Sequence, residues 1–318
     1  MQETATESSL AWTARLVAFA VAVIMVTSTF VLLAPNVAAK TGGPDAGSYN
    51  FTDSSESDGK VSYSWIDITS SGTAAGITSD TVSNSFDLGF SITYYGEDSD
   101  EFWIGGDNGW LSLDKPSASY AWIAYDMPGT AIAGTMLSSY WHDWILCNIG
   151  PNYGKVPDAE VYYEVQGTEP DRQLVVTWHE LSDWYECYYG TDWDDTITFQ
   201  AIIKENGDVI FQYEDASFEQ YYTFSPYQDV TVGIQGDSST GLTYDYGVGG
   251  SSFNDMAILL SPPPPPDNEL RLDNSQVPDP LSLAEQNIFT TDVNNRGANT
   301  QTDVGVNAKV FSTKVNTI

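Results

Sequence analysis

One hairpin constrains the fold of this chain more than any other feature of its sequence. Residues 196–204 and 208–213 both alternate apolar and polar side chains, which is the period of a β-strand. A two-residue Asn-Gly turn between them would split the apolar side chains over both faces. A three-residue Glu-Asn-Gly turn ending at Gly207 gathers them on one face. Since a slip of one residue exchanges the faces, burial predicts the three-residue turn, with Gly207 in the left-handed region. The predicted pairs are Phe199 with Tyr213, Ala201 with Phe211 and Ile203 with Val209.

Further short runs of strand character fill the middle of the chain. They are Ser62–Ile68, Ser85–Tyr94, Glu101–Ile104, Trp110–Leu113, Ala159–Gln166, Gln173–Trp178 and Val230–Gln235. Turn clusters rich in Gly, Asp and Asn separate these runs, and no helical period lies between them, which disfavours a parallel βαβ sheet. Aromatic residues make up 13% of the chain, an enrichment that favours strands. We therefore expect an all-β protein whose main domain, residues 60–260, is an antiparallel β-sandwich.

The charge of the chain excludes one class of partner. There are 44 acidic residues against 11 basic ones, a formal net charge of −33. Nucleic acid is not an expected partner, because phosphate binding requires clustered Lys and Arg. Two explanations of the acidity stay open. It is either a hydrated surface in salty water, where repulsion is screened, or a means of binding cations. The first explanation predicts a salt-adapted, archaeal source.

The N-terminal segment predicts export. Leu16–Leu33 is an uncharged apolar run whose length lies between that of a signal peptide and that of a membrane span. The small residues Val37-Ala38-Ala39 would suit signal cleavage. Residues 1–40 are therefore predicted to form a hydrophobic helix that is either a signal peptide or a transmembrane anchor. In both cases we expect the rest of the chain to be extracellular, as a secreted or a membrane-anchored cell-surface protein.

Residues 41–59 are polar and rich in Gly, Ser and Asp, a composition that predicts a flexible spacer. The segment contains the glycosylation sequon Asn50-Phe51-Thr52, so Asn50 is a candidate acceptor in an exported protein.

Six segments of the main domain follow one another as motifs of a known family do. They are Phe90–Gly96 (FSITYYG), Asp107–Ser112 (DNGWLS), Leu137–Asp143 (LSSYWHD), Leu174–Trp178 (LVVTW), Thr198–Tyr213 (TFQAII to GDVIFQY) and Thr231–Gln235 (TVGIQ). This series resembles an extracellular β-sandwich module, loosely nidogen-like, that occurs on secreted bacterial and archaeal proteases and surface proteins. The proline usual in the third motif is absent, since Ser139-Tyr140 precede Trp141. The family has no settled catalytic residues, so the resemblance implies an accessory extracellular module.

Two cysteines, Cys147 and Cys187, lie in the part that is predicted to be exported. A disulfide between them is the expected state. In the chain-entropy description, closing a loop of this length stabilises a protein by about 4 kcal/mol. A metal-binding pair or a catalytic thiol are the alternatives, but the chain has no CxxC spacing and few histidines to complete a zinc site.

His142-Asp143 and His179-Glu180 are the candidates for acid–base chemistry. Neighbouring residues of a strand point to opposite faces, so neither pair forms a ready dyad. The chain also lacks the Gly-x-Ser-x-Gly and His-Glu-x-x-His motifs of hydrolases. We therefore expect no enzymatic activity and name no catalytic residues.

The segment before the hairpin holds two candidate binding features. Its carboxylates, Asp192, Asp194 and Asp195, offer the oxygen ligands that calcium prefers, although a solvated loop explains them as well. No cofactor is expected apart from calcium at these carboxylates. The aromatic residues of the segment are Trp184, Tyr185, Tyr188, Tyr189 and Trp193. Exposed aromatic rings stack on sugars or fill a partner's pocket, whereas core packing would account for part of the set.

The C-terminal part begins with a polyproline linker, residues 261–268. Residues 269–318 resemble the first half of a CARDB-type, immunoglobulin-like adhesion domain, with strands predicted on either side of an Asn-Arg-Gly turn at residues 295–297. The later strands of such a domain are missing. Either the chain is a fragment of a longer surface protein, or the half-domain pairs with another chain through its open edge.

Together these features predict a non-catalytic adhesion or envelope-interaction protein of the cell surface or the secreted fraction. The expected partners are a cell-envelope component, a glycan or another surface protein, and the membrane through the N-terminal segment. Two alternatives remain: an accessory module of a secreted protease or other hydrolase, and a glycan-binding module that uses the aromatic residues.

Overall fold

The computed structural model describes residues 40–117, 122–130, 132, 134–148, 156–189, 196–217, 229–248, 253–265, 267, 270–276, 290–295, 297–302 and 304–306. The chain divides into two compact units, Met1–Ser261 and Pro262–Ile318.

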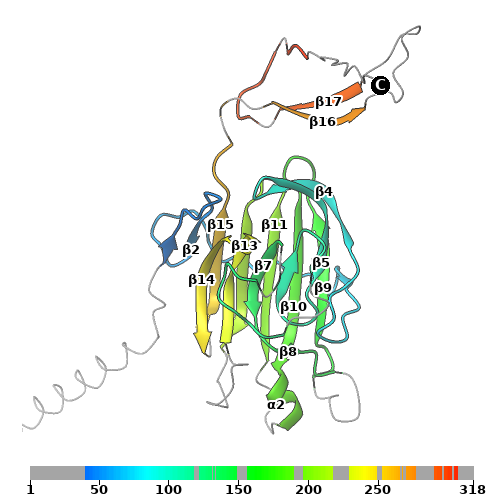
Figure 1. The fold of residues 1–318 in the computed structure, drawn as a ribbon. Coiled ribbons are helices and arrows are strands. Elements are labelled where there is room, and N and C mark those ends of the chain that lie inside the picture. Colours follow the sequence, from blue (N-terminus) through cyan, green and yellow to red (C-terminus); the bar gives the residue numbers. More distant parts are fainter. Residues whose placement is uncertain are drawn as a thin grey trace, which may run out of the picture. The chain divides into compact units, whose positions relative to one another are not determined.

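Two antiparallel sheets build the first unit (Figure 1). The larger sheet contains, from edge to edge, β1 (Thr41–Gly42), β2 (Asn50–Asp53), β15 (Phe253–Ser261), β12 (Val209–Ala216), β11 (Ile197–Lys204), β10 (Gln173–Asp183), β9 (Glu160–Gln166) and β3 (Thr73–Ala74), and β8 (Trp144–Ile145) pairs with the end of β10. The smaller sheet contains β14 (Thr240–Val248), β13 (Asp229–Asp237), β7 (Met136–Trp141), β6 (Trp110–Ser112), β5 (Glu97–Ile104) and β4 (Phe86–Tyr94). One short helix, α2 (Trp184–Tyr189), follows β10.

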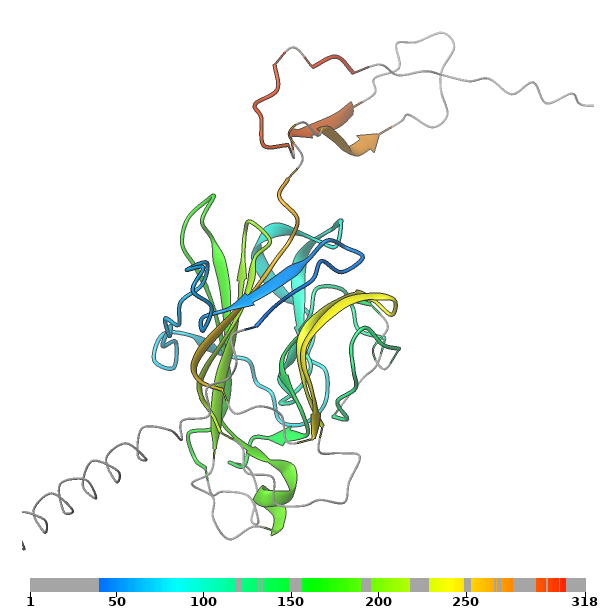
Figure 2. The same ribbon diagram turned by 90° about the vertical axis from the view of Figure 1, so that its left-hand side faces the viewer.

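The two sheets form the layers of a sandwich, which Figure 2 shows edge-on. Alternate side chains of each strand point inward. In β4, for example, Leu88, Phe90, Ile92 and Tyr94 are buried while the residues between them are exposed. Side chains from both sheets share one continuous apolar core. The all-β, antiparallel class that the sequence predicts is confirmed.

The hairpin of β11 and β12 has the predicted register. Phe199 pairs with Tyr213, Ala201 with Phe211 and Ile203 with Val209, and all six side chains are fully buried. At the turn, the Lys204 N–H donates to the Asp208 carbonyl at 2.9 Å, and the Gly207 N–H donates to the Lys204 carbonyl at 2.9 Å. The φ angle of Gly207 is 90°. The three-residue turn is therefore confirmed, for the reason given above: only this register places the whole apolar set in the core.

One predicted strand, residues 62–68, is not a strand in the structure; its residues cover part of the outer face of the larger sheet. They cross the outer face, where Gln212 and Ser64 exchange two hydrogen bonds of 2.6 and 2.9 Å, and the Gln200 amide donates to the Ile66 carbonyl at 3.3 Å. Gln200 and Gln212 lie on β11 and β12, and each of these strands already has a neighbouring strand on both sides. The segment therefore binds through side chains above the sheet instead of joining it.

Residues 41–59 are not a separate flexible spacer. β2 pairs with β15 along Asn50–Asp53, and β1 pairs with β2. The buried ring of Tyr49 stacks on Tyr95 with 4.3 Å between centroids. The carboxylate of the buried Asp53 accepts hydrogen bonds from the Tyr244 hydroxyl and the Lys40 N–H, both at 2.8 Å. The polar composition of the segment is typical of a linker. It does not reveal that Asp53 is buried, because the partners of Asp53 come together with it only in the folded domain.

In the second unit, β16 (Leu270–Gln276) and β17 (Thr290–Asn295) form an antiparallel pair in which Leu272 lies opposite Val293. The sequence predicted that the strand before the Asn-Arg-Gly turn at residues 295–297 would pair with the segment after this turn. The structure pairs β17 with β16 instead, and the described residues 300–302 and 304–306 form no strand.

Of the predicted signal peptide or membrane anchor, residues 1–40, all but Lys40 lie outside the described residues. Within the part of the chain that the structure describes, no helix has the length and apolar character needed to cross a membrane.

Candidate functional site

One end of the sandwich carries the features that the sequence singles out. β10 runs past the body of its sheet, passes an irregularity between Trp178 and Leu181 where Glu180 has a φ of 53°, and pairs briefly with β8. α2 follows directly, and Figure 1 shows it beyond the end of β10, beside β8. The aromatic segment is therefore a helical turn held at the tip of a long strand rather than an irregular loop.

Asp183 caps this helix. Its Oδ1 accepts a hydrogen bond from the Glu186 N–H at 3.0 Å, which is the usual contact of an N-cap carboxylate. The Trp184 N–H donates to the Asp143 carbonyl at 3.0 Å. Two of the free backbone N–H groups at the start of α2 thus have partners, one of them in the segment that leads into β8.

The other carboxylate oxygen of Asp183 contacts His142. Nε2 of this fully buried histidine lies 2.8 Å from Asp183 Oδ2, and its Nδ1 lies 3.1 Å from the Asp229 carbonyl oxygen. A carbonyl only accepts, so Nδ1 carries a proton. A second proton must then lie between Nε2 and the carboxylate, whichever of the two groups holds it. The adjacent Asp143 is not the hydrogen-bond partner of the ring. Sequence reasoning missed the pairing because Asp183 is distant along the chain.

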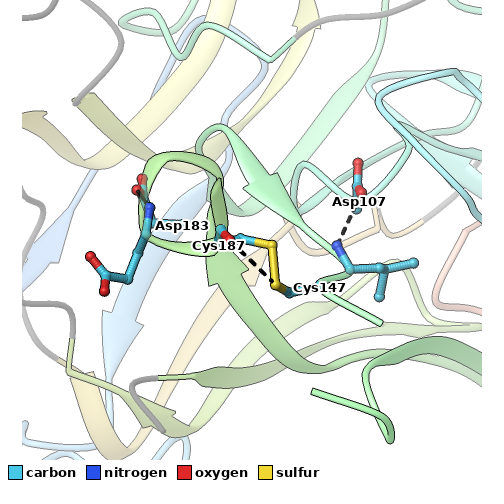
Figure 3. The surroundings of a disulfide bond; sticks show 6 residues. Asp107, Cys147, Asp183 and Cys187 are labelled. Atoms are coloured by element: carbon cyan, nitrogen blue, oxygen red, sulfur yellow. Dashed lines mark hydrogen bonds between the residues drawn. A yellow bond between two sulfur atoms is a disulfide. The ribbon is translucent and has the colours of Figure 1, made fainter. Parts of the chain in front are cut away.

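The predicted disulfide between Cys147 and Cys187 is present, with 5.8 Å between the Cα atoms (Figure 3). Both cysteines are fully buried. The bond joins the segment after β8 to the middle of α2 and closes a loop with a sequence separation of 40. Together with the cap and the His142 contact, it gives the short helix a third attachment to the sandwich.

α2 buries Glu186 and Cys187 and turns aromatic rings outward. Trp184 is 38% exposed, Tyr188 42% and Tyr189 58%, and these three residues are called the α2 rings below. Trp184 and Tyr188, four residues apart, stack with 5.5 Å between centroids and 13° between planes. The ring centroids of Tyr188 and Tyr189 lie 4.7 Å apart.

Of the other predicted residues in this segment, Tyr185 is half-buried and packs against Tyr189 with 4.6 Å between the ring centroids. Trp193 lies outside the described residues, as do the candidate calcium ligands Asp192, Asp194 and Asp195. The structure therefore brings four of the five predicted aromatic residues together and leaves the calcium prediction at these positions untested.

A second acidic group lies at the same end and escaped sequence reasoning. Asp107, in the turn between β5 and β6, is 1% exposed, and its Oδ2 accepts a hydrogen bond from the Leu146 N–H at 3.2 Å (Figure 3). Burial raises the pKa of Asp107 to about 7, and the negative charge of Asp80 adds to the rise. Burial and Asp80 likewise raise the pKa of Asp143 to about 7. The Asp-Asn-Gly sequence indicated only a turn here.

The remaining candidate residues are His179, of the second histidine–carboxylate pair, and Asn50, of the glycosylation sequon. His179 is half-buried, and its Nε2 is 3.8 Å from Glu180 Oε1. Asn50, the sequon residue, is exposed on β2, while Thr52 of the same sequon is buried and donates to Asp58 Oδ2 at 3.2 Å. An open pocket of about 540 Å³ adjoins Asn50. An acceptor role for Asn50 remains a prediction.

The motifs that carry the family resemblance have structural roles. The Tyr94 hydroxyl lies 3.3 Å from the carbonyl oxygens of both Met136 and Gln235, so the Tyr-Tyr-Gly motif ties β4 to β7 and β13. At Gly109 of the Asp-Asn-Gly motif, an added Cβ would lie 2.4 Å from the Tyr140 carbonyl oxygen, and φ is 76°. Glycine is therefore required where the turn approaches β7.

Comparison with known proteins agrees with these motifs. Residues 48–256, which are more than half of the chain, match the family described as NIDO related. No curated protein and no solved structure matches the chain. A NIDO-related domain and a buried disulfide indicate an extracellular protein, because disulfides persist in oxidising environments. The chain therefore belongs to the NIDO-related family, and its main domain is an extracellular β module of that family.

Proposed function

We propose that this protein is a non-catalytic recognition module of the cell surface or the secreted fraction, and that it binds a cell-envelope glycan through the α2 rings. One observation carries the proposal. Three large aromatic side chains are exposed on a helical turn that the disulfide, the Asp183 cap and the contact from His142 attach to the sandwich. An adhesion role would follow from binding the envelope of a neighbouring cell.

The physical argument rests on ring faces and rigidity. An aromatic face stacks on the apolar face of a sugar ring, and a ring that is already held in place loses little conformational entropy on binding. Contacts at three separate points leave α2 little freedom. The surrounding chain carries a net charge of −33, so the best ligand is a neutral glycan, because an anionic one would be repelled.

The histidines support a role without chemistry. His142 is fully buried, and both of its ring nitrogens already face oxygen atoms. It therefore has no nitrogen left to exchange a proton with a substrate. His179 lies beside Glu180 at a strand irregularity, and no nucleophilic side chain bonds to it among the described residues. An accessory role on a secreted protease or other hydrolase would use the same α2 rings, to hold that enzyme at its substrate.

Binding of the full chain to an array of neutral and anionic envelope glycans tests the proposal. Replacing Trp184 and Tyr188 together by alanine is expected to abolish binding, with circular dichroism unchanged. Tyr246→Ala is the matched control, because Tyr246 is equally exposed (41%) but lies on β14 of the other sheet. Glycan binding that survives the double replacement, or that Tyr246→Ala weakens to the same extent, would refute the assignment.

We also propose that residues 16–33 anchor the protein in the membrane or direct its secretion, and that residues 269–318 begin a CARDB-type adhesion domain. The uncharged apolar run supports the first point, and the sequence resemblance of residues 269–318 supports the second. N-terminal sequencing of the protein from its native cells separates a cleaved signal from an anchor.

A further inference from the structure

Three segments meet beside the turn between β5 and β6. The backbone of Gly106 packs on Asp80 so closely that an added Cβ would lie 2.8 Å from the Asp80 Cα. The Asn108 amide donates to Asp80 Oδ1 at 3.1 Å. The third segment closes over the turn, since the His142 N–H donates to the Asn108 carbonyl at 3.3 Å and the Leu146 N–H donates to Asp107. Asp80, Asp107 and Asp143 come from these three segments, and the charge of Asp80 is close enough to raise the pKa values of the other two carboxyl groups.

Two buried oxygen atoms at this place lack partners. Asp107 and Asn108 are 1% and 0% exposed, and neither Asp107 Oδ1 nor Asn108 Oδ1 has a hydrogen-bond partner among the described residues. Buried polar atoms are nearly always paired, because an unpaired one loses its hydration without compensation. Two such atoms on adjacent residues, both of them good ligands for hard cations, therefore require an explanation.

The charge of this place is also unbalanced. No lysine or arginine of the described part of the chain forms an ion pair with Asp80, Asp107 or Asp143. His142, the basic side chain that acts on Asp143, contacts Asp183. A buried carboxylate that lacks a basic partner is costly, and binding a metal ion is one of the few ways to compensate it.

We propose that Asp107, Asn108 and Asp80 form a divalent-cation site suited to calcium, with Asp143 beside it. The Asn108 amide nitrogen donates to Asp80 Oδ1, so Asn108 Oδ1 and the other carboxylate oxygen of Asp80 are the atoms left to hold the ion. No three His, Cys, Asp or Glu side chains of the described residues are placed to hold an ion by themselves. The site therefore takes two carboxylates and an amide oxygen, with water completing the shell. Calcium accepts six to eight such oxygen ligands in flexible geometry, whereas zinc prefers nitrogen and sulfur.

The position of this site gives it a structural consequence. The Asp107 carboxylate accepts a hydrogen bond from the N–H of Leu146, which precedes Cys147 of the disulfide, and the backbone carbonyl of Asp143 accepts one from the first N–H of α2. A cation here would hold the turn between β5 and β6 against the segments that carry α2. The site does not depend on glycan binding, and its residues differ from the acidic segment Asp192–Asp195.

Calcium chloride titrated into the chelator-treated full chain tests the proposal, with binding followed by calorimetry and the melting temperature as a second readout. We expect one site per chain and a melting temperature raised by several degrees, because a ligand that binds only the folded state stabilises it. Asp107→Asn keeps the size of the side chain and should weaken calcium binding at least tenfold. Asp80→Asn, at a half-buried position, should do the same and serves if the first variant does not fold.

The control replaces Asp192, Asp194 and Asp195 together by asparagine and should leave both readouts unchanged. The proposal is overturned if calcium produces neither heat nor a shift in melting temperature, or if Asp107→Asn and Asp80→Asn bind calcium as the unmodified chain does. It is equally overturned if the triple control abolishes binding, since the ion would then belong to the acidic segment before the hairpin.

Discussion

Nε2 of His142 lies 2.8 Å from Oδ2 of Asp183, and this contact joins the end of β7 in the smaller sheet to the cap of α2 beyond the larger one. The histidine ring also packs on Trp144 with 4.4 Å between ring centroids. One buried side chain thus links both layers of the sandwich to the helix that carries the α2 rings.

His142→Ala should lower the free energy of unfolding by about 3 kcal/mol, because it removes a fully buried side chain together with its contacts to the Asp183 carboxylate and the Asp229 carbonyl. Urea denaturation followed by tryptophan fluorescence measures the change. His179→Ala is the control. That histidine is half-buried and lies 3.8 Å from Glu180, so its loss should cost less than about 1 kcal/mol. Equal losses for the two variants would mean that the contact with Asp183 contributes nothing specific.

Replacing Cys147 and Cys187 together by alanine should lower the free energy of unfolding by about 4 kcal/mol in the chain-entropy description. The reason is that the unfolded chain has more conformational entropy when no disulfide closes the loop. Adding a reductant to the unmodified protein should lower its urea midpoint toward that of the double variant, and should leave the double variant itself unchanged. Two alkylatable thiols in the unreduced protein would contradict the disulfide.

Gly207→Ala should destabilise the hairpin by about 1–2 kcal/mol, because a side chain with a Cβ strains a residue at φ 90°. Thermal unfolding followed by circular dichroism measures the change. Asn206→Ala, one position earlier, removes two exposed hydrogen bonds with Asp208 and should cost less. If alanine were accepted equally well at both positions, the register would have to be fixed by something other than this turn.

Arg172 fastens the hairpin turn to both sheets. Its Nε donates to Glu205 Oε2 at 2.9 Å, and another guanidinium nitrogen donates to the Gly89 carbonyl of β4 at 3.2 Å. Arg172→Lys should lower the urea midpoint, because an ammonium group cannot make this set of bonds. Lys60→Ala is the control, since the ion pair of Lys60 with Asp58 joins residues only two positions apart in the chain. A midpoint lowered as much by Lys60→Ala would contradict the role of Arg172.

The same contact predicts a dependence on pH. Hydrogen bonds from the Arg172 side chain lower the pKa of Glu205 below its ordinary value. Because the pKa is lower in the folded state, Glu205 contributes stability above the ordinary glutamate pKa and loses it as the pH falls through the lowered value. The difference in urea midpoint between the unmodified chain and Arg172→Lys should therefore shrink on acidification. A difference that stays constant from neutral pH to pH values below that pKa would argue against the ion pair.

Some features were predictable because they depend on residues close together in the chain. The hairpin register follows from two alternating segments and a three-residue turn, and burial of Phe211 and Ile203 leaves one acceptable solution. The disulfide was predictable because two cysteines allow one pairing.

Other features could not be read because their partners are remote. Asp53 in the supposed spacer binds Tyr244, 191 residues later, and its burial follows only from that contact. Residues 62–68 have the pattern of a strand, yet they lie across a sheet whose central strands already have their partners. A local pattern describes which side chains are apolar, but it does not reveal which edge of a sheet is free.

The sequence by itself therefore determined the all-β class, the hairpin register and the covalent link between Cys147 and Cys187. In each case alternation, turn length or pairing acts over short distances or allows a single choice. Only the tertiary structure decided that α2 is a fixed helical turn, that His142 contacts Asp183 and that Asp80 meets Gly106 and Asn108. These contacts join segments from different strands, and they form only when the packing of two sheets brings their ends together.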